Sequence, residues 1–101
     1  MAEIKIFIWN MRRSRVDINQ VEIVRALRKC GCTVQNLSAV GKGCPDILVG
    51  YNGINYLMEI KNDKANKSDK VLTPDQVGWH GLWRGHVVVI EAIEEALSEL
   101  S

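Results

Sequence analysis

Three ionisable residues, Asp46, Glu59 and Lys61, occupy positions from which they could act on one substrate. Asn52-Gly53 separates two apolar runs, which is the strongest short-range signal of a β-hairpin and predicts a two-residue type I′ turn. Counting outward from that turn places Asp46 directly opposite Glu59, with Cβ atoms roughly 5 Å apart. Lys61 lies two residues beyond Glu59, so it projects from the same face of the strand. The hairpin therefore predicts that two carboxylates and one ammonium group converge.

The predicted carboxylate pair favours a divalent cation. Like charges placed opposite each other destabilise a sheet, so the two groups require a cation between them. Carboxylate oxygens, with room left for water and phosphate oxygens, suit Mg²⁺ better than Zn²⁺. The alternative is a solvated surface pair with Lys61 as its ion-pair partner, which is common on antiparallel sheets. The approach through Pro45, preceded by Gly41 and Gly43, favours the site because glycines let a backbone come close to a ligand.

The remaining elements predict an α/β layer fold with a mixed sheet. Amphipathic spacing, capping residues and glycine stops predict three helices: from Asp17 or Asn19 to Gly31, from Thr73 to about Arg84, and from Ala92 to Leu100. Apolar runs predict strands over Glu3–Trp9, Thr33–Leu37, Asp46–Tyr51, Ile54–Lys61 and Val87–Ile90. The last run is continuously apolar, which is typical of a strand covered on both faces. In the second hairpin strand, the side facing the core carries Tyr56, Met58 and Ile60.

The composition is that of an ordinary globular protein. The chain has 101 residues, enough for one domain, and 47% of them are hydrophobic. No apolar run reaches the ~18 residues of a membrane span, and Met1–Trp9 is too short and too charged for a signal peptide. The three cysteines, Cys30, Cys32 and Cys44, form no disulfide pattern, which favours a reduced, cytosolic compartment.

The formal net charge of +1 hides an asymmetry along the chain. Residues 1–70 hold 12 basic and 7 acidic side chains, whereas residues 71–101 hold one basic and five acidic ones. Basic side chains that could contact phosphates flank the predicted site in sequence: Arg12, Arg13, Arg15, Lys42, Lys64, Lys67 and Lys70. The alternative is a solvated surface run, above all for the lysines interspersed with aspartates. The charge pattern therefore permits a nucleic-acid partner on one face of the molecule.

Pro45-Asp46 followed by Glu59-Ile60-Lys61 resembles the signature of the PD-(D/E)XK nuclease superfamily. Gln76 with Trp79 resembles the glutamine-bearing helix that follows the catalytic strand in that superfamily. Together these features look most like the stand-alone VRR-NUC domains of bacteriophages, which are similar to Holliday-junction resolvases. The resemblance implies a restriction-endonuclease-like αβββαβ core with a mixed central sheet and helices on both faces. An N-terminal strand and a C-terminal helix are added to this core.

The resemblance covers about residues 12–100. Residues 12–101 are accordingly predicted to form a single nuclease domain, and residues 1–11 an extension strand. Within the domain the resemblance implies that Asp46, Glu59 and the backbone carbonyl of Ile60 bind Mg²⁺ or Mn²⁺. Glu22 stands where many members carry an extra acidic ligand, which implies that it holds a second ion or orients a water.

Roles for Lys61 and Gln76 also follow from the resemblance. Lys61 would position the attacking water or stabilise the charged phosphate, and Gln76 would orient Lys61 or contact a phosphate. The alternative for Gln76 is a capping box with Thr73, and both roles can hold together. Hydrolysis would leave a 5′-phosphate and a 3′-hydroxyl. Trp79 and Trp83, one helical turn apart, are predicted to pack in the core or in an interface.

The implied function is a metal-dependent, structure-selective DNA endonuclease. Resolving a four-way junction takes two paired cuts, which implies a homodimer with two active sites. The alternatives are selectivity for flaps, nicks or single strands, a non-catalytic nucleic-acid-binding module, and an interaction protein whose carboxylates are merely surface groups. The likeness to bacteriophage domains implies action in the cytoplasm of a bacterial host cell, and no membrane partner or organic cofactor is expected.

Overall fold

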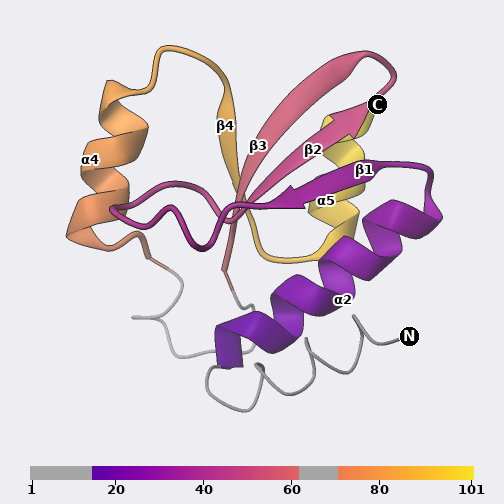
Figure 1. Cartoon of the computed structure of the whole chain (residues 1–101), viewed down its shortest axis with the longest axis horizontal. Helices are drawn as coiled ribbons and strands as arrows, with labels where there is room; N and C mark the ends of the chain where they lie inside the picture. The colour runs from indigo at the N-terminus through magenta and orange to yellow at the C-terminus, as the bar shows by residue number, and fades with distance from the viewer. Residues whose placement is uncertain (1–14, 62–70) are drawn as a thin grey trace.

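The chain alternates helices and strands around one sheet (Figure 1). The computed structural model describes residues 15–61 and 71–101. In chain order the elements are α2 (Arg15–Lys29), β1 (Thr33–Asn36), β2 (Ile47–Tyr51), β3 (Ile54–Ile60), α4 (Pro74–Leu82), β4 (Val87–Ile90) and α5 (Ile93–Leu100). The predicted α/β fold with its αβββαβ order and C-terminal helix is confirmed. The strand predicted over Glu3–Trp9 lies outside the described residues.

The four strands form a mixed sheet in the order β1-β2-β3-β4. The first three are antiparallel neighbours, and β4 runs parallel to β3. Asn52 and Gly53 have φ angles of 53° and 80°, as a type I′ turn requires. The pairing runs from Tyr51 opposite Ile54 to Ile47 opposite Met58, which confirms the predicted hairpin register.

One face of the sheet carries the hydrophobic core. Ile47, Val49, Met58 and Ile60 are completely buried on this face, and they pack with apolar residues of α2 and α5, among them Leu27. In Figure 1 α2 and α5 lie next to each other, whereas α4 stands apart beside β4. None of the helices in the described parts of the chain is long and apolar enough to cross a membrane.

Helix α4 belongs to the other face of the sheet. Glu59 and Lys61 alternate with Met58 and Ile60 along the strand direction, so they project away from the core. The side chain of Gln76 in α4 forms hydrogen bonds with both Glu59 and Lys61, which places α4 on their side. Helices on both faces are therefore present as predicted.

The prediction that Val87–Ile90 is covered on both faces is wrong. Val89 is paired in register with Glu59, so its side chain faces the α4 side of the sheet, and it is 41% exposed. No residue of α4 is buried, because this helix stands off the sheet instead of packing onto it. Among the described strands β4 lies at the edge of the sheet, so a continuously apolar run here forms an edge strand with one partly exposed face.

The predicted start of the first helix is also wrong. Helix α2 already includes Arg15, so Asp17 and Asn19 lie inside it and neither caps it. The side-chain amide of Asn19 instead donates to the main-chain carbonyls of Lys61 and Glu91, over 3.0 and 3.2 Å. Asn19 therefore ties α2 to the chain just beyond the ends of β3 and β4.

Substitution of Met58 by alanine tests the assignment of the core face. Met58 is completely buried, so Met58→Ala is expected to lower the free energy of unfolding by about 2–5 kcal/mol in urea titrations. Ile54→Ala, in the same strand but at a position 52% exposed, should cost under about 1 kcal/mol. Equal losses for the two variants would contradict the assignment.

Candidate metal and active site

Asp46 and Glu59 meet where the hairpin ladder ends. The last paired residues are Ile47 and Met58, so Asp46 and Glu59 are the next pair outward. Here the side chain of Asp46 replaces a backbone partner: its Oδ2 atom accepts a hydrogen bond of 2.7 Å from the main-chain N–H of Ile60. Because this bond fixes the Asp46 carboxylate against β3, the two carboxylates lie side by side as predicted.

Glu59 is the most constrained charge of the site. It is 2% exposed, and its Oε2 atom accepts a hydrogen bond of 3.1 Å from Nε2 of Gln76. Its Oε1 atom is buried and has no hydrogen-bond partner among the described residues. Burial is the main cause that raises the pKa of Glu59 to about 9. The adjacent Asp46 side chain also raises this pKa through its contact and its negative charge, while the charge of Lys61 lowers it.

Lys61 lies beside Glu59 and is held at both ends. Its Nζ atom donates a hydrogen bond of 2.7 Å to Oε1 of Gln76 and lies 4.0 Å from Oε2 of Glu59. Its backbone N–H donates to the carbonyl of Ile90 over 2.8 Å, which continues the contact between β3 and β4. With 10% of its side chain exposed, Lys61 places a nearly desolvated ammonium next to the buried Glu59 carboxyl group.

Gln76 takes part in the cap of α4 and also contacts Lys61. At the start of α4 the Thr73 hydroxyl accepts a hydrogen bond from the Gln76 N–H, and Oε1 of Gln76 accepts one from the Thr73 N–H, which together make a capping box. The same Oε1 atom accepts from Lys61, and Nε2 donates to Glu59. The predicted capping box is therefore present, and it fixes a side chain that is also hydrogen-bonded to Lys61 and Glu59. The catalytic role of Gln76 stays a prediction.

The segment before Asp46 packs against the first turn of α4. Gly41, Lys42 and Gly43 all have positive φ angles, of 74°, 55° and 86°. A Cβ atom on Gly43 would lie 2.2 Å from the carbonyl oxygen of Asp75, so glycine is required there by a close approach to α4. The sequence suggested that Gly43 makes room for a ligand, whereas in the structure it makes room for the helix that carries Gln76.

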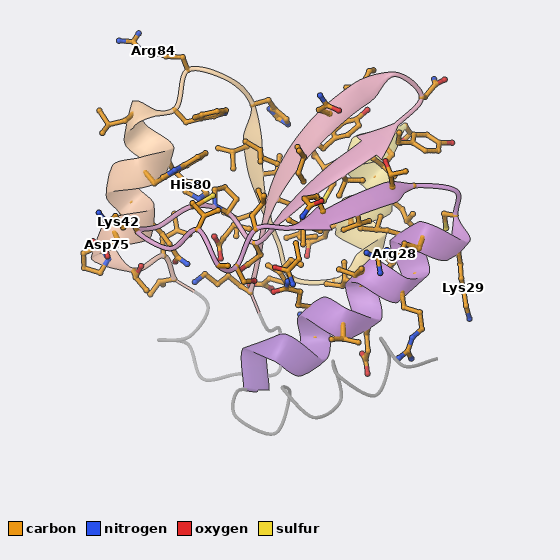
Figure 2. All side chains as sticks on the ribbon, in the orientation of Figure 1. Arg28, Lys29, Lys42, Asp75, His80 and Arg84 are labelled. Carbon is orange, nitrogen blue, oxygen red and sulfur yellow. The ribbon has the colours of Figure 1, made fainter. Side chains whose placement is uncertain are left out.

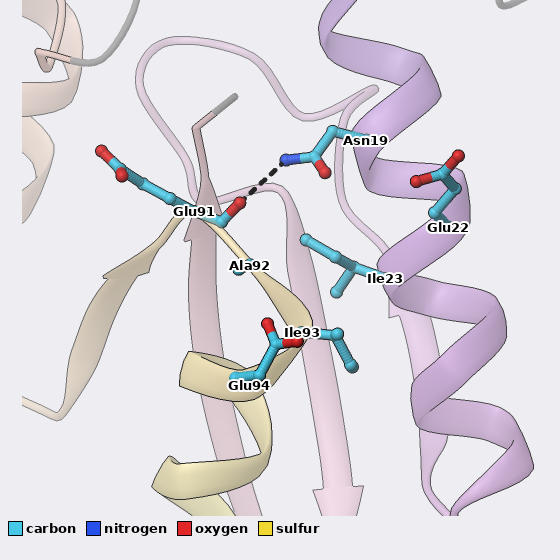
Figure 3. Close-up of a pocket in the computed structure, with 7 residues that line it drawn as sticks. All are labelled: Asn19, Glu22, Ile23, Glu91, Ala92, Ile93 and Glu94. Carbon is cyan, nitrogen blue, oxygen red and sulfur yellow. Dashed lines mark hydrogen bonds between the residues drawn. The ribbon is translucent and has the colours of Figure 1, made fainter. Parts of the chain in front are cut away.

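Glu22 is not part of this group. It is exposed on α2 and lines an open crevice of about 190 Å³ together with Asn19, Glu91 and Glu94 (Figure 3). Within residues 15–61 and 71–101, no three His, Cys, Asp or Glu side chains are grouped so as to hold an ion. The structure therefore brings together Asp46, Glu59, Lys61 and Gln76, and leaves Glu22 apart.

Of the predicted phosphate-contacting residues, Lys42 is the one whose side chain can be placed. It is exposed beside the first turn of α4, near Asp75 (Figure 2). Arg15 begins α2. The others lie outside the described residues: Arg12, Arg13, Lys64, Lys67 and Lys70.

Two residues near the site had no predicted role. His80 lies one turn beyond Gln76 in α4, and its buried Nε2 atom has no partner in the described part of the chain. Burial lowers the pKa of His80, and the charge of Lys61 lowers it further. Burial raises the pKa of the Cys44 thiol, with further contributions from Glu59 and Asp46. The four-residue spacing from Gln76 could have indicated His80, but no sequence pattern indicates Cys44.

The donor set fits a hard divalent cation. Two neighbouring carboxylates, one with an unpartnered buried oxygen, offer the oxygen ligands that Mg²⁺ and Mn²⁺ prefer. With no cation between them, the pair keeps Glu59 protonated at neutral pH, as its pKa of about 9 indicates. A cation bound there would favour the charged form of Glu59.

The fold is that of a known domain type. A solved structure described as a VRR_NUC domain matches with a TM-score of 0.61 and 22% sequence identity, over 84% of this chain and 92% of that chain. No family model and no curated protein matches the sequence. At this level of identity the likeness concerns architecture, and it confirms that the chain has the VRR_NUC fold that the sequence resembles.

The raised pKa of Glu59 predicts how stability depends on pH without metal. The folded state binds the Glu59 proton more tightly than the unfolded state, whose carboxyl has the ordinary pKa of 4.5. Glu59 therefore makes its full contribution to the free energy of unfolding below about pH 4.5. That contribution is lost as the pH rises toward about 9, by at most about 1.4 kcal/mol per pH unit. Urea unfolding in EDTA at several pH values should show this decline.

Glu59→Gln should flatten the decline, because glutamine does not titrate. Glu94→Gln, at an exposed position of α5, should keep the wild-type slope. The same slope in wild type and Glu59→Gln would show that Glu59 titrates normally.

The two glycines that precede the site form a matched pair. Both need a positive φ, so alanine at either position costs roughly 1–2 kcal/mol of stability from backbone strain. Only at Gly43 does the added Cβ also meet α4, since nothing lies within 4 Å at Gly41. Gly43→Ala is expected to destabilise the protein clearly more than Gly41→Ala in urea unfolding, and equal effects would contradict the contact with α4.

Proposed function

We propose that this protein is a metal-dependent DNA endonuclease that hydrolyses phosphodiester bonds. The proposal is supported by the carboxylate pair, the adjoining lysine and the glutamine that aligns them, all on a VRR_NUC fold. The observation that carries it is the Glu59 side chain, buried against Asp46 with one oxygen unpartnered among the described residues. A structural role alone would not favour two carboxyl groups there, because burying Glu59 beside Asp46 disfavours its charged form, as its raised pKa indicates.

The carboxylates of Asp46 and Glu59, with the backbone carbonyl of Ile60, are the proposed ligands. When bound there, Mg²⁺ or Mn²⁺ supplies charge neutralisation at the scissile phosphate and a water of lowered pKa. Glu22, which lies in the separate crevice, is a proposed ligand only for a second ion.

Lys61 and Gln76 are proposed to act on the phosphate and the water. The Lys61 ammonium is desolvated and fixed by Gln76, so it can donate to a phosphate oxygen or orient the attacking water without reorganising. Attack of water on phosphorus breaks the bond to the 3′ oxygen, which leaves with a proton as a 3′-hydroxyl. The phosphate then remains attached to the 5′ oxygen of the next nucleotide, so the fragment on the 3′ side of the cut begins with a 5′-phosphate.

The proposed substrate is branched DNA, with a four-way junction as the first candidate. One active site cuts one strand, so resolution of a junction requires a homodimer with two sites. Selectivity for flaps, nicks or single strands is the alternative within the same chemistry. Such an enzyme would act in the cytoplasm of a bacterial host.

Cleavage assays on labelled four-way junctions, flaps, single strands and blunt duplexes test this function. Wild type is expected to cut at least one substrate with Mg²⁺ or Mn²⁺ and none with EDTA. Lys61→Ala and Glu59→Gln should each reduce the rate by about 100-fold or more, since each removes a group that acts in the transition state. Lys29→Ala, at an exposed position of α2, is the matched control and should cut at the wild-type rate.

Two results would contradict the proposal. One is the absence of metal-supported cutting by wild type on the whole substrate panel. The other is an undiminished rate in Lys61→Ala. Metal-independent binding without cutting would favour a non-catalytic nucleic-acid-binding module instead.

A further inference from the structure

The C-terminal half of α4 and the residue that follows it carry a stacked pair of indoles. The rings of Trp79 and Trp83 lie 4.7 Å apart between centroids, with 18° between their planes. Trp83 caps the C-terminus of the helix, and its backbone N–H donates to the carbonyl of Trp79. The two side chains therefore form one aromatic unit at the end of α4.

Trp83 is held in place although it is outside the core. A Cβ atom on Gly85 would lie 2.8 Å from Nε1 of Trp83, so the chain after the helix packs closely on the indole edge. Trp79 stacks against Trp83 as well, yet Trp83 keeps 45% of its surface exposed. Of the two predicted locations for this residue, the core is excluded by its exposure, whereas packing in an interface stays a prediction. A fixed and half-exposed indole is a platform on which another flat group can stack.

The platform shares a face of α4 with the candidate active site. Gln76, His80 and Trp83 are spaced by four and three residues, so they lie along one side of the helix. Gln76 contacts Lys61 and Glu59, and Trp83 follows it by seven residues, or about 10 Å along the axis. That distance corresponds to about three stacked bases at 3.4 Å each.

The charge around the platform suits a phosphodiester chain. Residues 76–90 contain Arg84 and not one Asp or Glu. The two histidines add little positive charge, because the pKa of His80 is lowered and His86 lies 3.1 Å from the carboxylate of Glu99. Arg84 directly follows Trp83 and is exposed at the outer end of α4 (Figure 2). The acidic side chains begin at Glu91 and continue in α5, which packs on the core face.

We infer that Trp83 stacks on an unpaired nucleobase of the DNA strand that enters the proposed active site. This inference rests on the proposed nuclease activity. Within it, the inference favours the flap and single-strand alternatives over a fully paired four-way junction, because it requires a base outside a duplex. Every base offers a flat face, so stacking tolerates any sequence. The bases of an intact duplex are already stacked on each other, so Trp83 selects DNA with unpaired nucleotides near the cut.

Binding measurements on the full-length protein in EDTA separate this inference from catalysis. The probes are a fluorescent single-stranded oligonucleotide and a blunt duplex of the same sequence. Trp83→Ala is expected to weaken binding of the single strand by about 5-fold to 100-fold and to leave duplex binding unchanged. Trp83→Phe should retain most of the single-strand affinity, because phenylalanine keeps a flat ring.

Leu82→Ala is the matched control. Leu82 is 82% exposed and adjoins Trp83 in sequence, but it does not belong to the stacked pair. This variant should bind both probes as wild type does. With 2-aminopurine in the single strand, wild type should quench its fluorescence and Trp83→Ala should not.

Other outcomes overturn the inference in distinguishable ways. Equal losses for single strand and duplex, or no loss for Trp83→Ala, would overturn the inference and leave cleavage by wild type as support for the proposed function. A change from dimer to monomer on Trp83→Ala in sedimentation would instead make this face a contact between two copies. If wild type binds no DNA and cuts none, the inference and the proposed function both fail.

Discussion

The hydrogen bonds that join Glu59, Gln76 and Lys61 are the interaction on which the rest of the structure depends. A carboxyl group and an ammonium are taken out of water on the side of the sheet opposite the core, and burial of such groups is stable only with fixed polar partners. Gln76 provides a donor for one and an acceptor for the other. It can do so because the capping box fixes its side chain at the start of α4. The strand, the helix and the loop before Asp46 must therefore all keep their relative positions.

Local signals in the sequence predicted most of this arrangement. Asn52-Gly53 determined the hairpin register and so the meeting of Asp46 with Glu59, and Thr73-Pro74 marked the start of α4. Failures came where the outcome depends on distant segments. The apolar run around Val89 did not indicate that α4 would leave that face of β4 exposed. Asn19, expected to cap the first helix, instead donates hydrogen bonds to two main-chain carbonyls far along the chain. For Glu22, helical position alone could not show that its side chain lines another crevice.

Helix α4 serves the site without contributing to the core. Its contacts with the rest of the described chain include the bonds of Gln76 and the close approach of Gly43, which together hold its first turn. Beyond that first turn, the same side of the helix leads to the indole pair at its C-terminal end. The near-neutral net charge is compatible with DNA on this side, because the acidic residues from Glu91 onward lie in or next to α5. One short helix thus connects the charges proposed for chemistry with the surface proposed for substrate selection.

Calorimetric titration of Mn²⁺ into the metal-free protein at neutral pH is the most direct test of the central claim, that Asp46 and Glu59 form a cation site. The account predicts saturable binding by wild type, loss of that binding in Glu59→Gln, and wild-type affinity for the first ion in Glu22→Gln. Proton release should accompany binding, since Glu59 is protonated when no cation is bound. Unchanged Mn²⁺ binding in Glu59→Gln, or its loss in Glu22→Gln alone, would contradict the account.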